Sequence, residues 1–150
     1  MKSLVFDMDG TFVNLYGVDG WLEMLINEDS TPYTVAEPLY DMDTFNTLVG
    51  ILQDEGWHIV ITSWLSKDSS EEYAEAVKVA KMDWLRKYNV PFNEIHLIPY
   101  GTDKGSCTEN LGGFQILFDD NDDIRNLWTL GLAIDAKQNL LEKLADIIIG

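Results

Sequence analysis

Cysteine, positive charge and long apolar runs are all scarce in this sequence of 150 residues. The single cysteine, Cys107, excludes an internal disulfide, which is typical of proteins from a reducing compartment. No apolar run approaches the roughly 20 residues that a membrane-spanning helix needs. The first residues lead straight into a short apolar run with one lysine. We therefore expect no signal peptide, no membrane contact and a cytoplasmic location.

Basic residues are far fewer than acidic ones, 10 against 26, which gives a formal net charge of −16. Such an acidic surface repels nucleic-acid backbones, so we expect no binding to duplexes or long single strands. A small phosphorylated ligand remains compatible, because a few local cations can overcome the general field. The otherwise ordinary composition and the length fit a single domain, residues 1–150, with a full core.

Short apolar runs alternate with helical patterns along the chain. The runs are typical of buried strands and cover residues 4–6, 58–61, 95–98, 115–118 and 132–134. Helical spacing covers residues 44–55, with Gly56 as a stop, then 69–88, 121–127 and 138–147. A capping-box spacing from Ser69 to Glu72 opens the long helix. This alternation predicts the α/β class, a three-layer Rossmann-like fold whose parallel sheet carries helices on both faces.

The segment Phe6-Asp7-Met8-Asp9-Gly10-Thr11 directly follows the first apolar run. Residues two apart in an extended chain point to the same side, so Asp7 and Asp9 face together, and Gly10 allows a sharp turn. Two carboxylates at a strand tip can hold a hard cation such as Mg²⁺, and they supply a nucleophile and an acid/base for phosphoryl chemistry. The alternative is an ordinary turn. An EF-hand loop is excluded because its first and last ligand positions would be Val5 and Tyr16.

Other expected strands also end in polar residues, as the position of ligand sites in such sheets requires. The second ends in Thr62 and Ser63, the fourth ends in Asp119 and Asp120, and Lys104 follows the third. Each feature alone is common in loops and helix starts. Their ordered occurrence at successive strand ends is what points to one shared site.

This order of motifs resembles the haloacid dehalogenase superfamily of phosphohydrolases, over the chain from Leu4 to its C-terminus. The first motif matches at residues 7–11, the second at 59–62, the third at Lys104 and the fourth at 116–120. With the expected strands numbered along the chain, the resemblance implies the sheet order 5-4-1-2-3. It also implies a Mg²⁺-dependent phosphatase, with a small lid inserted after the first strand.

The resemblance gives each matching acid a role. Asp7 would attack phosphorus and become an aspartyl phosphate, while Asp9 would protonate the leaving oxygen and then activate water. Mg²⁺ would be held by Asp7, by the backbone carbonyl of Asp9 and by an acid of the fourth motif. The motif pattern favours Asp120 as that acid. The alternates are Asp119 and Asp123, and Asp122 is expected to face solvent.

The phosphate would be bound by Thr62 and Lys104, with Ser63 sharing the work of Thr62 and Lys67 as an alternative to Lys104. Mg²⁺ and a lysine would let an anionic nucleophile approach an anionic phosphate within an acidic protein. A non-hydrolytic phosphate- and Mg²⁺-binding or regulatory module on the same fold is the alternative from another functional class.

About thirty residues separate the first strand from the helix at residue 44, and we expect a small lid at about 12–43 with one helix at 20–27. Its aromatic residues include Tyr16 and Trp21, which could stack a base or simply pack the lid onto the body. The strand ends are similar to those of the 5'-deoxyribonucleotidase branch. A (deoxy)nucleoside monophosphate is thus one candidate substrate, beside a sugar phosphate and a phosphorylated polynucleotide end.

Overall fold

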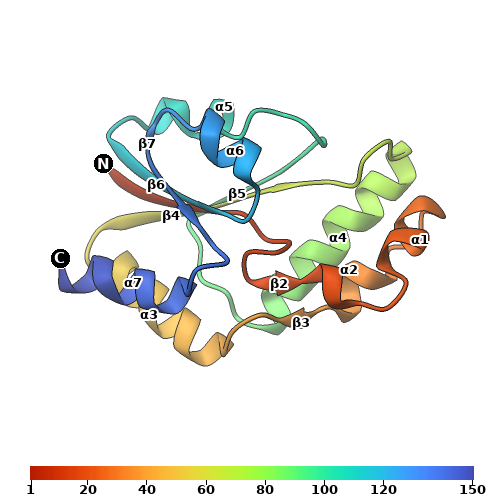
Figure 1. Cartoon of the computed structure of the whole chain (residues 1–150), viewed down its shortest axis with the longest axis horizontal. Coiled ribbons are helices and arrows are strands. Elements are labelled where there is room, and N and C mark those ends of the chain that lie inside the picture. Colours follow the sequence, from red (N-terminus) through yellow and green to blue (C-terminus); the bar gives the residue numbers. More distant parts are fainter.

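The computed structural model describes residues 1–150 and contains a five-stranded, wholly parallel sheet (Figure 1). Its strands lie in the order β5 (Glu94–Ile98), β4 (Trp57–Trp64), β1 (Lys2–Phe6), β6 (Phe114–Asp119), β7 (Gly131–Asp135). Read from β7, these are the ranges expected as strands 5-4-1-2-3. The labels differ because two short strands outside this sheet are also counted. The predicted α/β class is confirmed.

Helices cover both faces of the sheet and complete three layers. On one face lie α3 (Met42–Asp54), α7 (Leu140–Ile149) and the C-terminal part of α4 (Glu71–Lys87), where Trp84 and Leu85 join the main core. The other face carries the 3₁₀ turn η2 (Glu109–Leu111) and α6 (Asp122–Leu127), and the short helix α5 (Gly105–Thr108) precedes η2. None of the helices combines the length and the apolar character that crossing a membrane requires.

Helix boundaries follow from local hydrogen bonds. The long helix α4 begins later than the capping box predicted, because Ser70 Oγ accepts from the backbone N–H of Tyr73 while Ser69 Oγ donates to the carbonyl of Ser66. Gly56 follows α3 with φ +96°, a conformation that favours glycine, as expected for a helix stop. The expected helices are present with ends shifted by a few residues.

The segment between β1 and α3, residues 12–41, contains more structure than the single helix expected; we call it the lid segment. Helix α1 (Trp21–Ile26) matches the prediction. The segment also holds η1 (Leu15–Gly17), a second helix α2 (Thr31–Val35) and an antiparallel ribbon of β2 (Val13–Asn14) with β3 (Glu37–Pro38). Sequence reasoning missed α2, whose signal is Pro32 in its first turn. Helix α2 packs on α4, beyond one side of the sheet (Figure 1).

Four phenylalanines form the centre of the main core, beside the strand that leads to Asp7. Phe6 stacks on Phe118 of the neighbouring strand with ring centroids 4.9 Å apart and meets Phe45 of α3 edge-on at 5.6 Å. Phe12, at the start of the lid segment, packs on Phe45 at 5.2 Å. The last residues of β1 and β6 are therefore fixed by aromatic packing immediately before their carboxylates.

This packing predicts a large stability loss for Phe6→Ala. The side chain is 1% exposed, and its removal leaves a cavity at the centre of the core. We expect the free energy of unfolding, measured by urea denaturation, to fall by about 3–5 kcal/mol. Phe114→Ala, at a position that is 49% exposed on β6, is the matched control and should cost less than about 1 kcal/mol. Similar losses for the two variants would contradict the packing argument.

Candidate active site

The carboxyl ends of the central strands converge on a group of acids and one lysine. Asp7 follows β1, Asp119 ends β6, and Lys104 stands at the N-terminus of α5; the three residues are 7%, 1% and 3% exposed. Asp7 is held by the hydroxyl of Thr11, which donates to its Oδ2 at 3.0 Å. The structure thus brings together residues from three of the four motifs that the sequence placed at strand ends.

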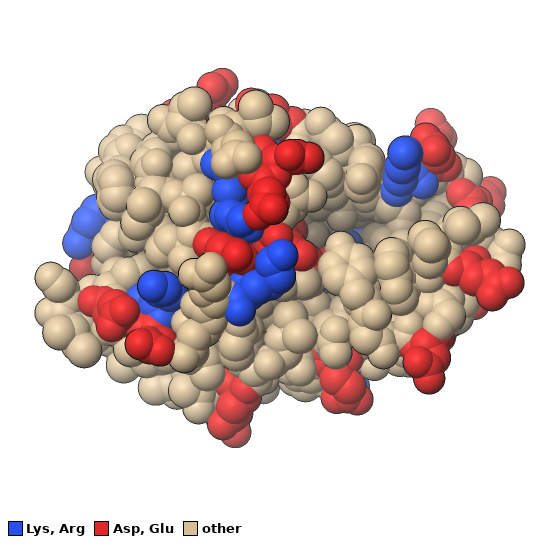
Figure 2. Space-filling model, in the orientation of Figure 1, with Lys and Arg blue, Asp and Glu red and all other residues tan.

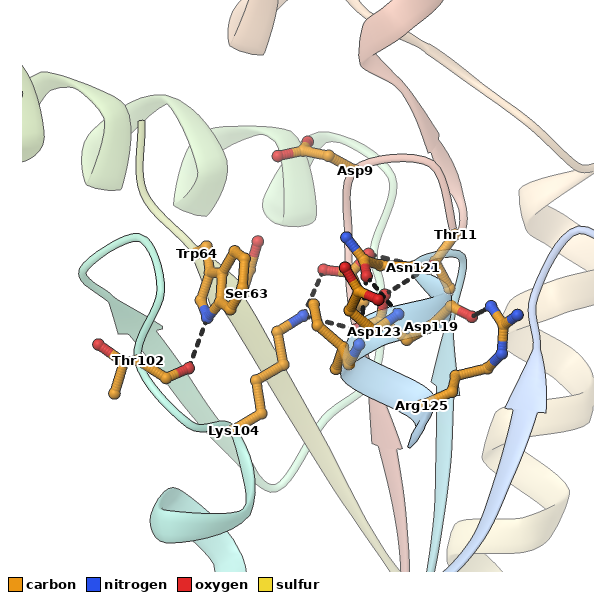
Figure 3. A network of polar contacts seen from close by, with 12 residues as sticks. Asp9, Thr11, Ser63, Trp64, Thr102, Lys104, Asp119, Asn121, Asp123 and Arg125 are labelled. Carbon is orange, nitrogen blue, oxygen red and sulfur yellow. Dashed lines mark hydrogen bonds and ion pairs between the residues drawn. The ribbon is translucent and has the colours of Figure 1, made fainter. Parts of the chain in front are cut away.

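Lys104 joins two of these acids. Its Nζ donates to Asp7 Oδ1 at 2.8 Å and to Asp119 Oδ2 at 2.7 Å (Figure 3). Burial alone would lower the pKa of Lys104, but the charges of Asp7 and Asp119 outweigh it, and its pKa is raised. The side chain therefore stays a cation beside the proposed nucleophile.

Asp7, Asp119 and Asp120 form a carboxylate triad, with one oxygen of each within 4.8 Å of the others. Burial, followed by the charge of Asp7, raises the pKa of Asp119 to about 6 and that of Asp120 to about 8. Crowded carboxylates of this kind are the oxygen ligands that Mg²⁺ prefers, and a cation would relieve their repulsion. The donor chemistry of the triad therefore fits the predicted metal.

The backbone at Gly10 allows Asp120 to lie close to Asp7. Gly10 has φ +82°, and a Cβ there would lie 2.2 Å from Asp120 Oδ2. Any other residue would push Asp120 away from Asp7, so the glycine of the first motif is required by the acid of the fourth. Asp123 lines the nearby cleft but lies outside the triad, and Asp122 is exposed and pairs with Arg125.

Asp9 lies apart from the triad and points away from it toward α4 (Figure 3). Its Oδ2 accepts from Lys81 Nζ at 2.6 Å, and the same ammonium donates to Ser63 Oγ at 2.9 Å. Sequence reasoning missed Lys81. The available signal was its position on the buried stripe of α4, four residues after Val77 and four before Leu85, where an apolar residue is expected.

Of the two hydroxyls near the end of β4, Ser63 is the one that lines the cleft. Thr62 follows Ile61, which pairs with Phe6, so it stands beside Asp7 in the sheet. It is fully buried, however, and its hydroxyl has no hydrogen-bond partner. Ser63 lines the cleft and Thr62 does not. Phosphate binding by Thr62 and by Ser63 thus stays a prediction, and Ser63, although only 1% exposed, is the one with a place in the cleft lining.

A cleft of about 850 Å³ extends from the acids to the lid segment, visible as a hollow in the space-filling view (Figure 2). Lys67 lies at its wall, 5.9 Å from the ring of Tyr100, and makes no ion pair with Asp7, so Lys104 is the lysine of the inner site. Apolar and aromatic side chains of the lid segment also line this cleft: Leu15, Tyr16, Trp21, Leu22, Leu25, Ile26 and Tyr33. Tyr16 and Trp21 meet edge-on at 4.9 Å.

Comparison with known proteins finds a similarity of fold. No protein-family model matches the chain, and no curated protein matches it. A similar solved structure is that of D,D-heptose 1,7-bisphosphate phosphatase from B. bronchiseptica, complexed with magnesium and phosphate. The two chains share 12% identity with a TM-score of 0.55, over 98% of this chain and 99% of the other. At this identity the likeness shows a common fold.

The triad predicts a distinct response to pH and metal. In EDTA, a buried carboxyl whose pKa is raised from 3.8 to about 8 destabilises the folded state increasingly as pH rises between these values, because the unfolded chain releases its proton first. We expect Asp120→Asn to remove this penalty and to melt above wild type in EDTA at pH 8, with a smaller difference at pH 5.

Mg²⁺ should raise the melting temperature of wild type and have much less effect on Asp120→Asn, because the variant lacks one carboxylate of the triad. The exposed neighbour provides the control, and Asp122→Asn should keep the wild-type response to Mg²⁺. A variant at Asp120 that is less stable than wild type in EDTA at pH 8, or that gains as much from Mg²⁺, would rule out this assignment.

Proposed function

We propose that the chain is a Mg²⁺-dependent phosphatase that hydrolyses a small phosphate monoester through an aspartyl phosphate on Asp7. The observation that carries the proposal is the position of Asp7, which lies between the Lys104 ammonium and two further carboxylates at the inner end of an open cleft. The fold shared with a phosphatase whose structure contains magnesium and phosphate supports the same reaction class.

The chain's own residues account for the proton and bond changes. The Asp7 carboxylate attacks phosphorus, the bond from phosphorus to the ester oxygen breaks, and Asp9 gives its proton to that oxygen. Asp9 then takes a proton from the water that attacks the aspartyl phosphate, which releases inorganic phosphate and restores Asp7. When bound, Mg²⁺ would be held by the triad acids and the Asp9 carbonyl and would neutralise charge on the phosphoryl oxygens.

Few side chains can bind the phosphate, because basic residues are rare in this chain. Lys104 and Ser63 both line the cleft, and Thr62 is the third proposed ligand. Among the acids, we propose Asp120 beside Asp7 as the direct metal ligand, with Asp119, already bonded to Lys104, as the alternate. The net charge of −16 supports a small phosphorylated substrate and argues against binding to duplexes or long single strands.

For the substrate we propose a (deoxy)nucleoside monophosphate, with the lid segment as a lid on a single domain. Tyr16 and Trp21 form an aromatic corner in the cleft wall that the lid segment contributes, and apolar side chains of α1 extend it. Such a wall suits a planar base better than a sugar rich in hydroxyls. We also propose a cytoplasmic location, consistent with the lone thiol of Cys107.

Asparagine substitutions test the mechanism. Asp7→Asn removes the nucleophile and Asp9→Asn removes the acid/base, each with little change of shape. We expect each to lower the turnover number kcat for p-nitrophenyl phosphate with Mg²⁺ by about 100-fold or more, Asp9→Asn because hydrolysis of the aspartyl phosphate then lacks its base. Asp54→Asn, at an exposed position of α3, is the control and should retain full turnover. Full turnover by Asp7→Asn would exclude the mechanism. Mg²⁺ binding without phosphate release from any ester would instead indicate a non-hydrolytic module.

The lid tests the substrate class. If a base stacks in the aromatic corner, Trp21→Ala should raise KM for nucleoside monophosphates about ten- to a hundred-fold, because stacking contributes roughly 1–3 kcal/mol per base. KM for p-nitrophenyl phosphate, which is smaller, should change less. A parallel screen of nucleotides, sugar phosphates and oligonucleotide ends under the same Mg²⁺ ranks the candidates. A wide advantage of sugar phosphates in kcat/KM would overturn the nucleotide proposal and leave the phosphatase proposal intact.

A further inference from the structure

Lys81 of α4 is a buried cation that the mechanism above does not use. The residue is 1% exposed and lies outside the cleft lining. An ammonium group has three donors, and the surroundings of Lys81 Nζ engage it on three sides: Asp9 Oδ2 at 2.6 Å, Ser63 Oγ at 2.9 Å and the face of the Tyr33 ring at 5.0 Å. Lys81 therefore joins three elements that are distant in sequence.

Stability alone is a poor explanation for a lysine at this position. Val77 and Leu85 lie one turn away on either side and are fully buried, so an apolar residue at position 81 would continue the stripe without the cost of desolvating a charge. Buried ion pairs of this kind are often no more stabilising than well-packed apolar residues. What Lys81 adds is a fixed orientation for its partners, and both hydrogen-bond partners line the cleft.

We propose that Lys81 is a positioning residue, which holds the Asp9 carboxylate and the Ser63 hydroxyl in the geometry that proton transfer to the leaving group requires. The inference rests on the proposed phosphatase function. Catalytic groups lose much of their effect when misplaced by about 1 Å, and a buried lysine with every donor engaged fixes its partners more tightly than solvent could.

The third contact of Lys81 links this geometry to the lid segment. Tyr33 belongs to α2, and its hydroxyl lies 2.5 Å from Ser66 Oγ in the loop after β4. The ring that covers Lys81 is thus fixed to the same loop region that follows Ser63. Helix α4 therefore orients Asp9 from one side through Lys81, which the Tyr33 ring of the lid segment contacts in turn, while the Asp9 side chain remains 14% exposed and lines the cleft.

The test compares substrates that differ in their need for a general acid. Lys81→Met keeps the length of the side chain and removes the charge, and Lys78→Met removes a half-exposed lysine of the same helix as the matched control. For an alkyl phosphate such as glycerol phosphate, whose leaving group must be protonated, we expect Lys81→Met to lower kcat/KM about ten- to a hundred-fold. For p-nitrophenyl phosphate, whose leaving group departs without a proton, the loss should be under about threefold. Lys78→Met should match wild type on both.

A double-mutant cycle separates positioning of Asp9 from general damage. If Lys81 acts through Asp9, then Lys81→Met should have little further effect on kcat/KM for the alkyl phosphate in the Asp9→Asn background. Independent, additive losses in the cycle, or equal losses on both substrates, would overturn the proposal. Lys81→Gln, which keeps an N–H donor, should recover part of the activity on the alkyl phosphate.

If the variants at position 81 fail to fold, the wild-type protein can still test whether Lys81 positions Asp9. A crystal structure with Mg²⁺ and a phosphate mimic should retain the hydrogen bond from Lys81 to Asp9, and separation of the two side chains would overturn the proposal. Failure of the proposed function is distinguishable, because wild type would then release no phosphate from any ester. If wild type is active but the losses of kcat/KM in the double-mutant cycle are additive, only the role of Lys81 is contradicted and the proposed function stands.

Discussion

Asp7, Asp119 and Asp120 repel one another where the central strands end, and the rest of the site depends on how this repulsion is offset. Three acids each place an oxygen within 4.8 Å of the others, and like charges at about 4 Å repel by roughly 4 kcal/mol even at an effective dielectric constant near 20. Lys104 offsets part of this repulsion from within the cluster, and the Lys81 ammonium lies 2.6 Å from the Asp9 carboxyl group beside it. The remaining negative charge creates the demand for a divalent cation, and the cation would in turn attract the phosphate.

The architecture explains why these groups meet. Strand β1 lies at the centre, so its neighbours β4 and β6 bring their last residues to either side of Asp7. Stacked phenylalanines fix β1 and β6 immediately before their acids, and Gly10 gives the close approach that Asp120 needs. The lid segment lies beyond the carboxyl ends of the central strands (Figure 1), and its apolar side chains line the cleft. Acids fixed by packing and an apolar wall from the lid segment suit a constant reaction on a substrate chosen by its non-reacting part.

Local sequence signals predicted most of this arrangement, because strands, helices and strand-end residues depend on periodicity and on neighbours in the chain. Asp7, Asp119, Asp120 and Lys104 were all identified and lie together. Signals that depend on packing were missed. Lys81 is 72 residues from Asp9 in the sequence, and the sequence shows it only as a lysine within the apolar stripe of a helix. Helix α2 has five residues, too few for a period. Which of Thr62 and Ser63 faces the cleft depends on how β4 ends against its neighbours.

Direct chemical trapping of the intermediate tests the central claim, that Asp7 is phosphorylated during turnover. Borohydride reduces an acyl phosphate to an alcohol, so treatment of the enzyme during turnover of a phosphate ester with Mg²⁺ converts a phosphorylated aspartate to homoserine. Peptide mass spectrometry should then find homoserine at position 7, dependent on substrate and absent in EDTA. Release of phosphate with position 7 unchanged, or with the conversion at Asp119 or Asp120 instead, would contradict the account.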